Sequence, residues 1–316
     1  MGTGRDLEIA CDESGSEGEN LTTPVTDVFA HAGVLLDAEA AQAVIVELRE
    51  RIRSPATEYK ANHLLRGKHR SALVWLLGPS GPIHGVARVY LLEKRFFLVS
   101  RIADLVDPYG PSLGFHRREE TEALYRWGPR LDGWPRLLET FNDVIRGRAE
   151  TEAFYAQVSA LRSPELAELL ERLGATRPNL ETALARRADD PRAIPVLDPL
   201  IPAIVQGVLA WSSGGRSVSI IHDQQTTLSE ERIVELKEIL GDPRLAARAR
   251  LAGLTLADSF VDARVQMADF LAGVARKIAS EELNGRGDAE LTELLRHYVD
   301  PASLWGHAPS WSRLRP

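Results

Sequence analysis

The sequence predicts an α/β protein in which helices flank a mixed β-sheet and a large helical segment is inserted into the chain. Three observations support this prediction. Short apolar or alternating segments, typical of strands, lie near both ends of the 316-residue chain. Segments with helical periodicity separate these strands. Residues 107–215, in contrast, have a helical pattern interrupted repeatedly by prolines and contain no convincing strand.

The composition is that of an ordinary globular protein, with 44% hydrophobic and 26% charged residues. Cys11 is the single cysteine, which excludes an intrachain disulfide and favours a reducing cytoplasm. The apolar runs are too short to span a bilayer, so we expect no membrane association. The net charge of −7 argues against a protein that coats nucleic acid indiscriminately, although it is compatible with an enzyme that has a local basic groove.

The first part of the chain predicts three strands and three helices. Residues 7–15 alternate in polarity and end at a Ser-Gly-Ser turn, and residues 28–36 follow closely enough to pair with them as an antiparallel hairpin. Asp37 is a suitable cap for the first helix. The other predicted elements are helices at 38–53, 68–77 and 95–106 and a third strand at 83–92.

Sheet character returns after the insertion. Residues 217–222 predict a strand that ends on Asp223, and residues 254–257 predict a last strand. Thr227 and Glu230 form a capping-box pattern for the helix between them, and Asp262 is a suitable cap for a long helix at 264–283. A short helix is expected at 289–297. We therefore predict a discontinuous core formed by 1–106 and 216–282, a helical insertion or lid at 107–215 and a C-terminal tail at 283–316.

Carboxylates stand where two of the predicted strands end. Asp12 and Glu13 close the first strand, and Asp223 closes the strand after the insertion. A rigid sheet can fix an oxygen ligand at such a position while the adjacent loop stays open to substrate. Aspartate and serine beside glycine are also ordinary turn formers, so the first strand end by itself allows a purely structural interpretation.

A third carboxylate lies on the long late helix. Gln266, Asp269 and Gly273 share one helix face, and their neighbours are apolar. Such a face is poorly suited to water, and a buried carboxylate needs partners or a metal ion. The alternative is an ion pair between Asp269 and Arg264 or Arg276 within the same helix.

Together, Asp12, Asp223 and Asp269 could gather at one side of the sheet. All-oxygen ligands favour Mg²⁺ or Mn²⁺ over Zn²⁺, and a pair of such ions supports in-line hydrolysis of a phosphate ester. His222 is next to Asp223 but faces the other side of the sheet, so we expect it to have a packing role.

Four motifs resemble a known family when taken in order. They are Asp12-Glu13-Ser14-Gly15 after a strand, Glu58-Tyr59-Lys60 before a helix, a strand closing on Lys94, and Asp258-Ser259 ahead of Gln266-Met267-Ala268-Asp269. Over residues 5–106 and 216–282 this pattern resembles the domain-of-unknown-function family 3800. The resemblance implies a ribonuclease H-like fold whose site contains Asp12, Asp223 and Asp269, with Glu13, Glu58, Gln266 and Ser259 nearby. Cys11 and the segment 107–215 depart from the family pattern.

The leading hypothesis is therefore a two-metal nuclease. Asp12, Asp223 and Asp269 would hold the ions, Glu13 or Glu58 would assist a second ion or orient water, and Lys60, Lys94 or an arginine cluster would contact phosphate. Two alternatives stay open. One is a non-catalytic scaffold that binds a partner protein or nucleic acid in a mobile-element or phage-defence system. Whether the protein forms a homodimer is also left open by the sequence. The other is a metal-dependent phosphatase for a small phosphoester.

Overall fold

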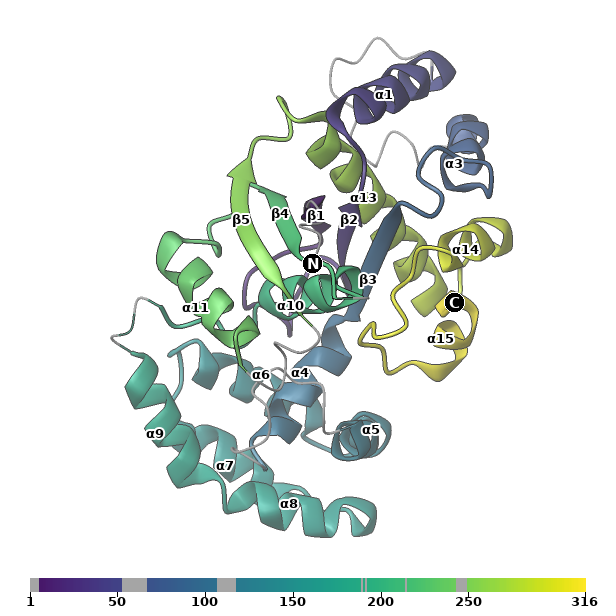
Figure 1. Cartoon of the computed structure of the whole chain (residues 1–316). Helices are drawn as coiled ribbons and strands as arrows, with labels where there is room; N and C mark the ends of the chain where they lie inside the picture. The colour runs from purple at the N-terminus through teal and green to yellow at the C-terminus, as the bar shows by residue number, and fades with distance from the viewer. Residues whose placement is uncertain are drawn as a thin grey trace. The chain divides into compact units, whose positions relative to one another are not determined.

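The chain forms two compact units in the computed structural model, which describes residues 6–52, 67–106, 118–188, 190, 192–213, 215–242 and 249–316 (Figure 1). The first unit comprises Met1–Ser16, Val28–Leu92 and Ala203–Pro316. The second comprises Glu17–Asp27 and Glu93–Pro202. The second unit thus begins and ends earlier than the insertion expected at 107–215, and it also includes the loop after the first strand.

A five-stranded mixed sheet forms the centre of the first unit, which confirms the α/β prediction. β1 is antiparallel to β2 and parallel to β4, and β4 is parallel to β5. The third strand begins at Ala87, four residues later than the pattern predicts. The strands, in the order β3-β2-β1-β4-β5, are β1 (Leu7–Ser14), β2 (Val28–Val34), β3 (Ala87–Glu93), β4 (Val218–Asp223) and β5 (Leu251–Ala257).

Both faces of the central strand β1 are covered. Ala10 belongs to the apolar core that β2 forms with α13 (Ala263–Leu283). Ile9 and Cys11 instead line a small cavity together with Gly207 and Trp211 of α10 (Leu200–Trp211). Because side chains alternate along a strand, Asp12 faces α13 with Ala10, whereas Glu13 lies on the opposite side of the sheet.

The long helix α13 is fixed along β1 at two points. Its N-terminus is capped by the side chain of Asp262, as predicted, because Oδ1 accepts a 2.9 Å hydrogen bond from the backbone N–H of Arg264. The Arg264 guanidinium also bonds Glu8 of β1. Further along the helix, Nε of Arg276 donates a 2.9 Å hydrogen bond to Oγ of Ser14. α13 therefore runs in the same direction as β1.

The remaining elements of the first unit lie around this sheet. The capping-box prediction is wrong in detail: Ser229, not Thr227, caps α11 by accepting a hydrogen bond from the backbone N–H of Arg232. These elements are α1 (Ala38–Ile52), η1 (Gly67–His69), α3 (Arg70–Leu77), α11 (Glu230–Leu240), α14 (Ala289–Arg296) and α15 (Ala308–Leu314).

The segment expected as a C-terminal tail is part of the same core. Tyr298, Trp305 and Leu314 are buried in the apolar cluster that contains α13. The chain between α14 and α15 runs beside β3, where Val299 and Leu304 bridge to Val89 and Leu92. The C-terminal residues 283–316 therefore contribute to the sheet unit directly.

The second unit is helical in its described residues outside the loop at 17–27, as the proline-interrupted pattern predicts. Phe97, Trp134, Phe141 and Phe154 are buried in it. Among the described residues of the whole chain, no helix is long and apolar enough to cross a membrane. The helices of this unit are α4 (Lys94–Asp104), α5 (Arg118–Trp127), η2 (Gly128–Arg130), α6 (Trp134–Ile145), α7 (Thr151–Ala160), η3 (Pro164–Leu166), α8 (Ala167–Gly174) and α9 (Arg177–Arg187).

Candidate carboxylate site

Asp12 is a buried carboxylate near the end of β1, with 6% of its surface exposed. Its Oδ1 accepts a 2.7 Å hydrogen bond from the backbone N–H of Glu13. Burial, followed by the negative charges of Glu13, Asp269 and Asp223, raises the pKa of Asp12 to about 9. The carboxylates predicted from distant parts of the sequence thus lie within electrostatic range of one another.

The parallel pairing of β1 with β4 determines where Asp223 lies. Cys11 lies opposite His222 in this ladder, so the next residues of the two strands, Asp12 and Asp223, lie at the same end of the sheet. Oδ1 of Asp223 accepts a 3.1 Å hydrogen bond from the backbone N–H of Ser259, in the turn after β5. The main chain of Ser259 therefore fixes one carboxylate of the site. This agrees with the position near the site that the family motifs imply for Ser259.

Asp269 reaches Asp12 from the helix that covers this face of the sheet. Asp269 and Gln266 are both partly buried on α13, whose other face is embedded in the apolar core. The alternative ion pair with Arg264 is disfavoured, because that guanidinium is held by Asp262 and Glu8. Arg276, the other suggested partner, bonds Ser14 through Nε, which leaves its other two guanidinium nitrogens able to pair with Asp269.

Glu13 occupies a different environment from the three aspartates. Its Oε1 accepts a hydrogen bond from Nε2 of Gln225, and its Oε2 lies 3.7 Å from Nε2 of His222. His222 in turn lies against His31, with 3.3 Å between their Nε2 atoms. Burial, followed by the neighbouring His222, holds the pKa of His31 well below its ordinary value. A buried polar cluster therefore lies on the sheet face opposite Asp12.

The three aspartates suit a divalent cation by their chemistry. They supply only oxygen ligands, which Mg²⁺ and Mn²⁺ prefer. A cation would also offset the mutual repulsion that raises the pKa of Asp12. Within the described ranges, however, no three His, Cys, Asp or Glu side chains are arranged as a ready coordination shell. The site fits the ion by donor type and charge, and its side chains would have to converge further on binding.

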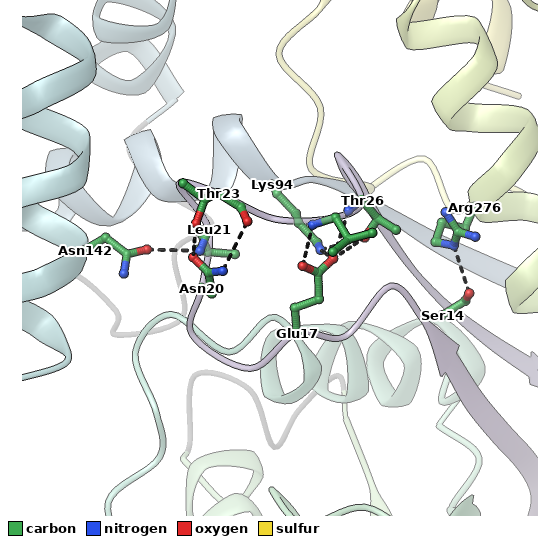
Figure 2. A network of polar contacts seen from close by, with 10 residues as sticks. Ser14, Glu17, Asn20, Leu21, Thr23, Thr26, Lys94, Asn142 and Arg276 are labelled. Atoms are coloured by element: carbon green, nitrogen blue, oxygen red, sulfur yellow. Dashed lines mark hydrogen bonds and ion pairs between the residues drawn. The ribbon is translucent and has the colours of Figure 1, made fainter.

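Only one of the two lysines predicted to contact phosphate is described by the structure. Lys60, like Glu58, falls outside the described residues. Lys94 belongs to the second unit and is only 1% exposed; its Nζ donates hydrogen bonds to Glu17 Oε1 at 2.8 Å and Thr26 Oγ1 at 2.7 Å. Figure 2 shows this network, which extends through the loop at 17–27. An internal ammonium with a carboxylate partner does not favour the predicted role of Lys94 in phosphate contact.

Arg276 is the basic residue that sequence reasoning missed at this site. It stands seven positions after Asp269 and hence on the same face of α13. Its contact with Ser14 places a guanidinium close to the end of β1 (Figure 2). The seven-residue spacing from Asp269 is the signal that could have identified Arg276 as a phosphate contact, whereas the sequence pattern suggested it only as an ion-pair partner.

Comparisons with protein-family models, with curated proteins and with solved structures found no match for this chain. The resemblance to family 3800 therefore rests on its short motifs.

Proposed function

We propose that this protein is a divalent-metal-dependent phosphodiesterase that acts on nucleic acid and has a ribonuclease H-like fold. The observation that carries the proposal is the buried carboxylate of Asp12 with two further aspartates from different elements in electrostatic range. Carboxylates crowded in this way are costly unless a cation or a proton compensates their charge. The strand order β3-β2-β1-β4-β5, with β2 antiparallel to β1, is compatible with the fold that the motifs imply.

The aspartates, two backbone amides and Arg276 have separate roles at the site. Asp12, Asp223 and Asp269 would hold the metal ions, which when bound would activate a water molecule and stabilise the leaving oxygen. The backbone N–H groups of Glu13 and Ser259 orient Asp12 and Asp223, because each donates to one carboxylate oxygen and leaves the other available. Arg276 supplies positive charge on the same helix face for a substrate phosphate.

An exposed aromatic residue beside the site supports a nucleic acid over a small phosphoester. Phe260 and Val261 are 73% and 83% exposed, immediately after Ser259. The turn that carries them is well ordered by hydrogen bonds, with Asp258 accepting from the backbone N–H groups of both residues. An exposed aromatic ring on such a turn is a platform on which a nucleobase can stack.

The test is metal-dependent cleavage by aspartate-to-asparagine variants. Labelled single-stranded and double-stranded DNA and RNA are incubated with Mn²⁺ and wild-type protein, Asp12→Asn or Asp269→Asn. We expect both variants to lose cleavage while retaining the circular dichroism of the wild type. Asp37→Asn is the matched control, because it makes the same chemical change where asparagine can still cap α1.

Wild-type-like cleavage by both site variants would overturn the proposal. A wild-type protein that neither cleaves any of these substrates nor responds to Mn²⁺ would instead favour the non-catalytic scaffold. Turnover of a small phosphomonoester alone would favour the phosphatase.

A further inference from the structure

We infer that Glu13 is a positioning residue, which ties the end of β1 to the end of β4 from the sheet face opposite the aspartates and thereby sets the spacing of Asp12 and Asp223. The inference rests on the proposed function in so far as these aspartates bind metal. It assigns Glu13 a role different from the metal or water contact expected from its place next to Asp12.

The connection through Glu13 lies directly beyond the last paired residues of β1 and β4. β1 and β4 pair from Leu7 opposite Val218 to Cys11 opposite His222, and no later pair follows. Asp12 and Asp223 come directly after the last pair. Each still pairs with an outer strand, at Ala32 of β2 and Ala257 of β5, but the β1–β4 ladder does not join them to each other. A side-chain connection at this level is the simplest way to hold the two strand ends together.

Glu13 makes that connection to both sides of Asp223. Its Oε1 accepts a hydrogen bond from Gln225, two residues after Asp223, and its Oε2 faces the ring of His222, the residue before it. The His222 ring is oriented toward the same strand end, since its Nδ1 lies 3.0 Å from the backbone oxygen of Asp223 and can donate to it. The Glu13 carboxylate thus contacts a residue on each side of Asp223 in the chain, His222 and Gln225.

The burial of Glu13 gives this contact its importance. Only 8% of the Glu13 side chain is exposed, and within the described structure its Oε2 has no hydrogen-bond partner at ordinary distance. A carboxylate buried in this way depends strongly on the contacts that it does make. Loss of Gln225 would leave Glu13 without its side-chain hydrogen bond and allow the β4 end to move.

Two backbone amides report the positions of the aspartates without any metal. The N–H of Glu13 is bonded to Asp12, and the N–H of Ser259 is bonded to Asp223. Hydrogen exchange at these amides, measured by NMR in EDTA, therefore tests the tie even if the metal proposal fails. Mn²⁺ affinity, measured by electron paramagnetic resonance, tests its consequence for the site.

The informative variants are Gln225→Ala and Glu13→Gln. Gln225 is partly exposed, so its replacement should leave the fold intact. We expect Gln225→Ala to speed exchange of the Ser259 amide and to weaken Mn²⁺ binding about 10-fold, the usual effect of removing a group that orients a metal ligand. Glu13→Gln keeps an oxygen that can accept from Gln225, so it should retain most of the amide protection.

Gln224→Ala is the matched control, because it removes an exposed glutamine from the same segment. It should leave both amides and the Mn²⁺ affinity unchanged. The inference is overturned if Gln225→Ala leaves the exchange of the Ser259 amide at the wild-type rate, or if Gln224→Ala has the same effect as Gln225→Ala. Absence of Mn²⁺ binding by the wild type would contradict the proposed function, and the exchange measurement would still decide the role of Glu13.

Discussion

Arg276 of α13 donates a 2.9 Å hydrogen bond from its Nε to Oγ of Ser14, two residues beyond Asp12 in β1. At the other end of the same strand, Arg264 bonds Glu8. Asp269 lies between these two arginines on the helix, and its charge acts on Asp12 between the two anchored residues of the strand. The two arginine contacts hold α13 in register with β1, so the helical carboxylate is delivered to the strand end without a loop.

Replacement of Arg276 should weaken substrate binding and spare the metal. We expect Arg276→Gln to raise the KM for an oligonucleotide about 10-fold or more, since hydrogen bonds to charged groups contribute about 1.5–3 kcal/mol. Mn²⁺ affinity should stay close to that of the wild type or rise, because Arg264 still anchors α13 through Glu8 and Asp262 and a positive charge is removed near the aspartates. Steady-state kinetics with Lys277→Gln as control makes the comparison, since it removes a charge from the neighbouring helix position. Equal effects of the two variants would contradict a phosphate contact.

Asp12 should make the metal-free protein less stable as the pH rises. Its pKa is about 9 in the folded chain and close to 4 when unfolded, so the folded state holds the proton more tightly. The contribution of this group to the free energy of unfolding is therefore largest below pH 4 and decreases as the pH rises toward 9. Asp12→Asn has no proton to lose.

The measurement is denaturant unfolding of wild type and Asp12→Asn in EDTA at several pH values. The stability of the variant relative to wild type should increase between pH 5 and 9. Saturating Mn²⁺ should reverse that order, because an ion that binds only the folded wild type stabilises it by about 2.7 kcal/mol at 100 times its Kd. A difference that does not change with pH would show that Asp12 is ionised throughout this range.

The sequence predicted the sheet well because its strands carry local signals. Two local patterns identify strands: the alternation in residues 7–15 identifies β1, and the apolar run before Asp223 identifies β4. The helical spacing of Gln266 and Asp269 identifies the face of α13 that meets these strands. These same local patterns also located the aspartates. β1 pairs with β4, which lies about 200 residues later in the sequence, and local patterns do not reveal this pairing. The pairing brings the two strand ends together, as predicted.

Features that depend on distant partners escaped prediction. The loop 17–27 joins the second unit because Leu21 N–H bonds Asn142 and Glu17 bonds Lys94, and neither partner is near it in sequence. The C-terminal residues have weak local patterns, yet burial of Trp305 and Leu314 makes them part of the core. The contacts of Glu13 with Gln225 and His222 depend on the pairing of β1 with β4, which no local pattern reveals.

The buried pair of Lys94 and Glu17 should stabilise the second unit. Burial alone would raise the pKa of Glu17, but hydrogen bonds from Lys94, Thr26 and two backbone N–H groups lower it to about 2. Glu17 therefore contributes stability above pH 4.5 that is lost as the pH falls toward 2. Lys94→Met should cost about 1.5–3 kcal/mol, the usual contribution of a hydrogen bond to a charged group, because the partly exposed Glu17 keeps its other donors.

Denaturant unfolding at pH 7 measures this cost, with Arg136→Met as an exposed control in the same unit. The double variant Glu17→Gln/Lys94→Met should recover part of the loss, because it leaves no unpaired buried charge. A Lys94→Met protein with normal stability and reduced cleavage would instead support the phosphate contact predicted from the sequence.

Phe260 should distinguish a nucleic-acid substrate from a small phosphoester. Stacking of a base on an aromatic ring contributes about 1–3 kcal/mol, so Phe260→Ala should raise the KM for a single-stranded oligonucleotide about 10-fold. Phe260→Trp should restore the wild-type value, because indole offers a larger stacking surface. Hydrolysis of a small non-aromatic phosphoester, which offers no ring to stack on Phe260, should be the same in all three proteins. Val234→Ala controls for the loss of an exposed apolar side chain on α11, where 49% of Val234 is exposed. If Phe260→Ala slows the small substrate as much as the oligonucleotide, the turn acts on the geometry of Asp223 through Ser259 and not on a base.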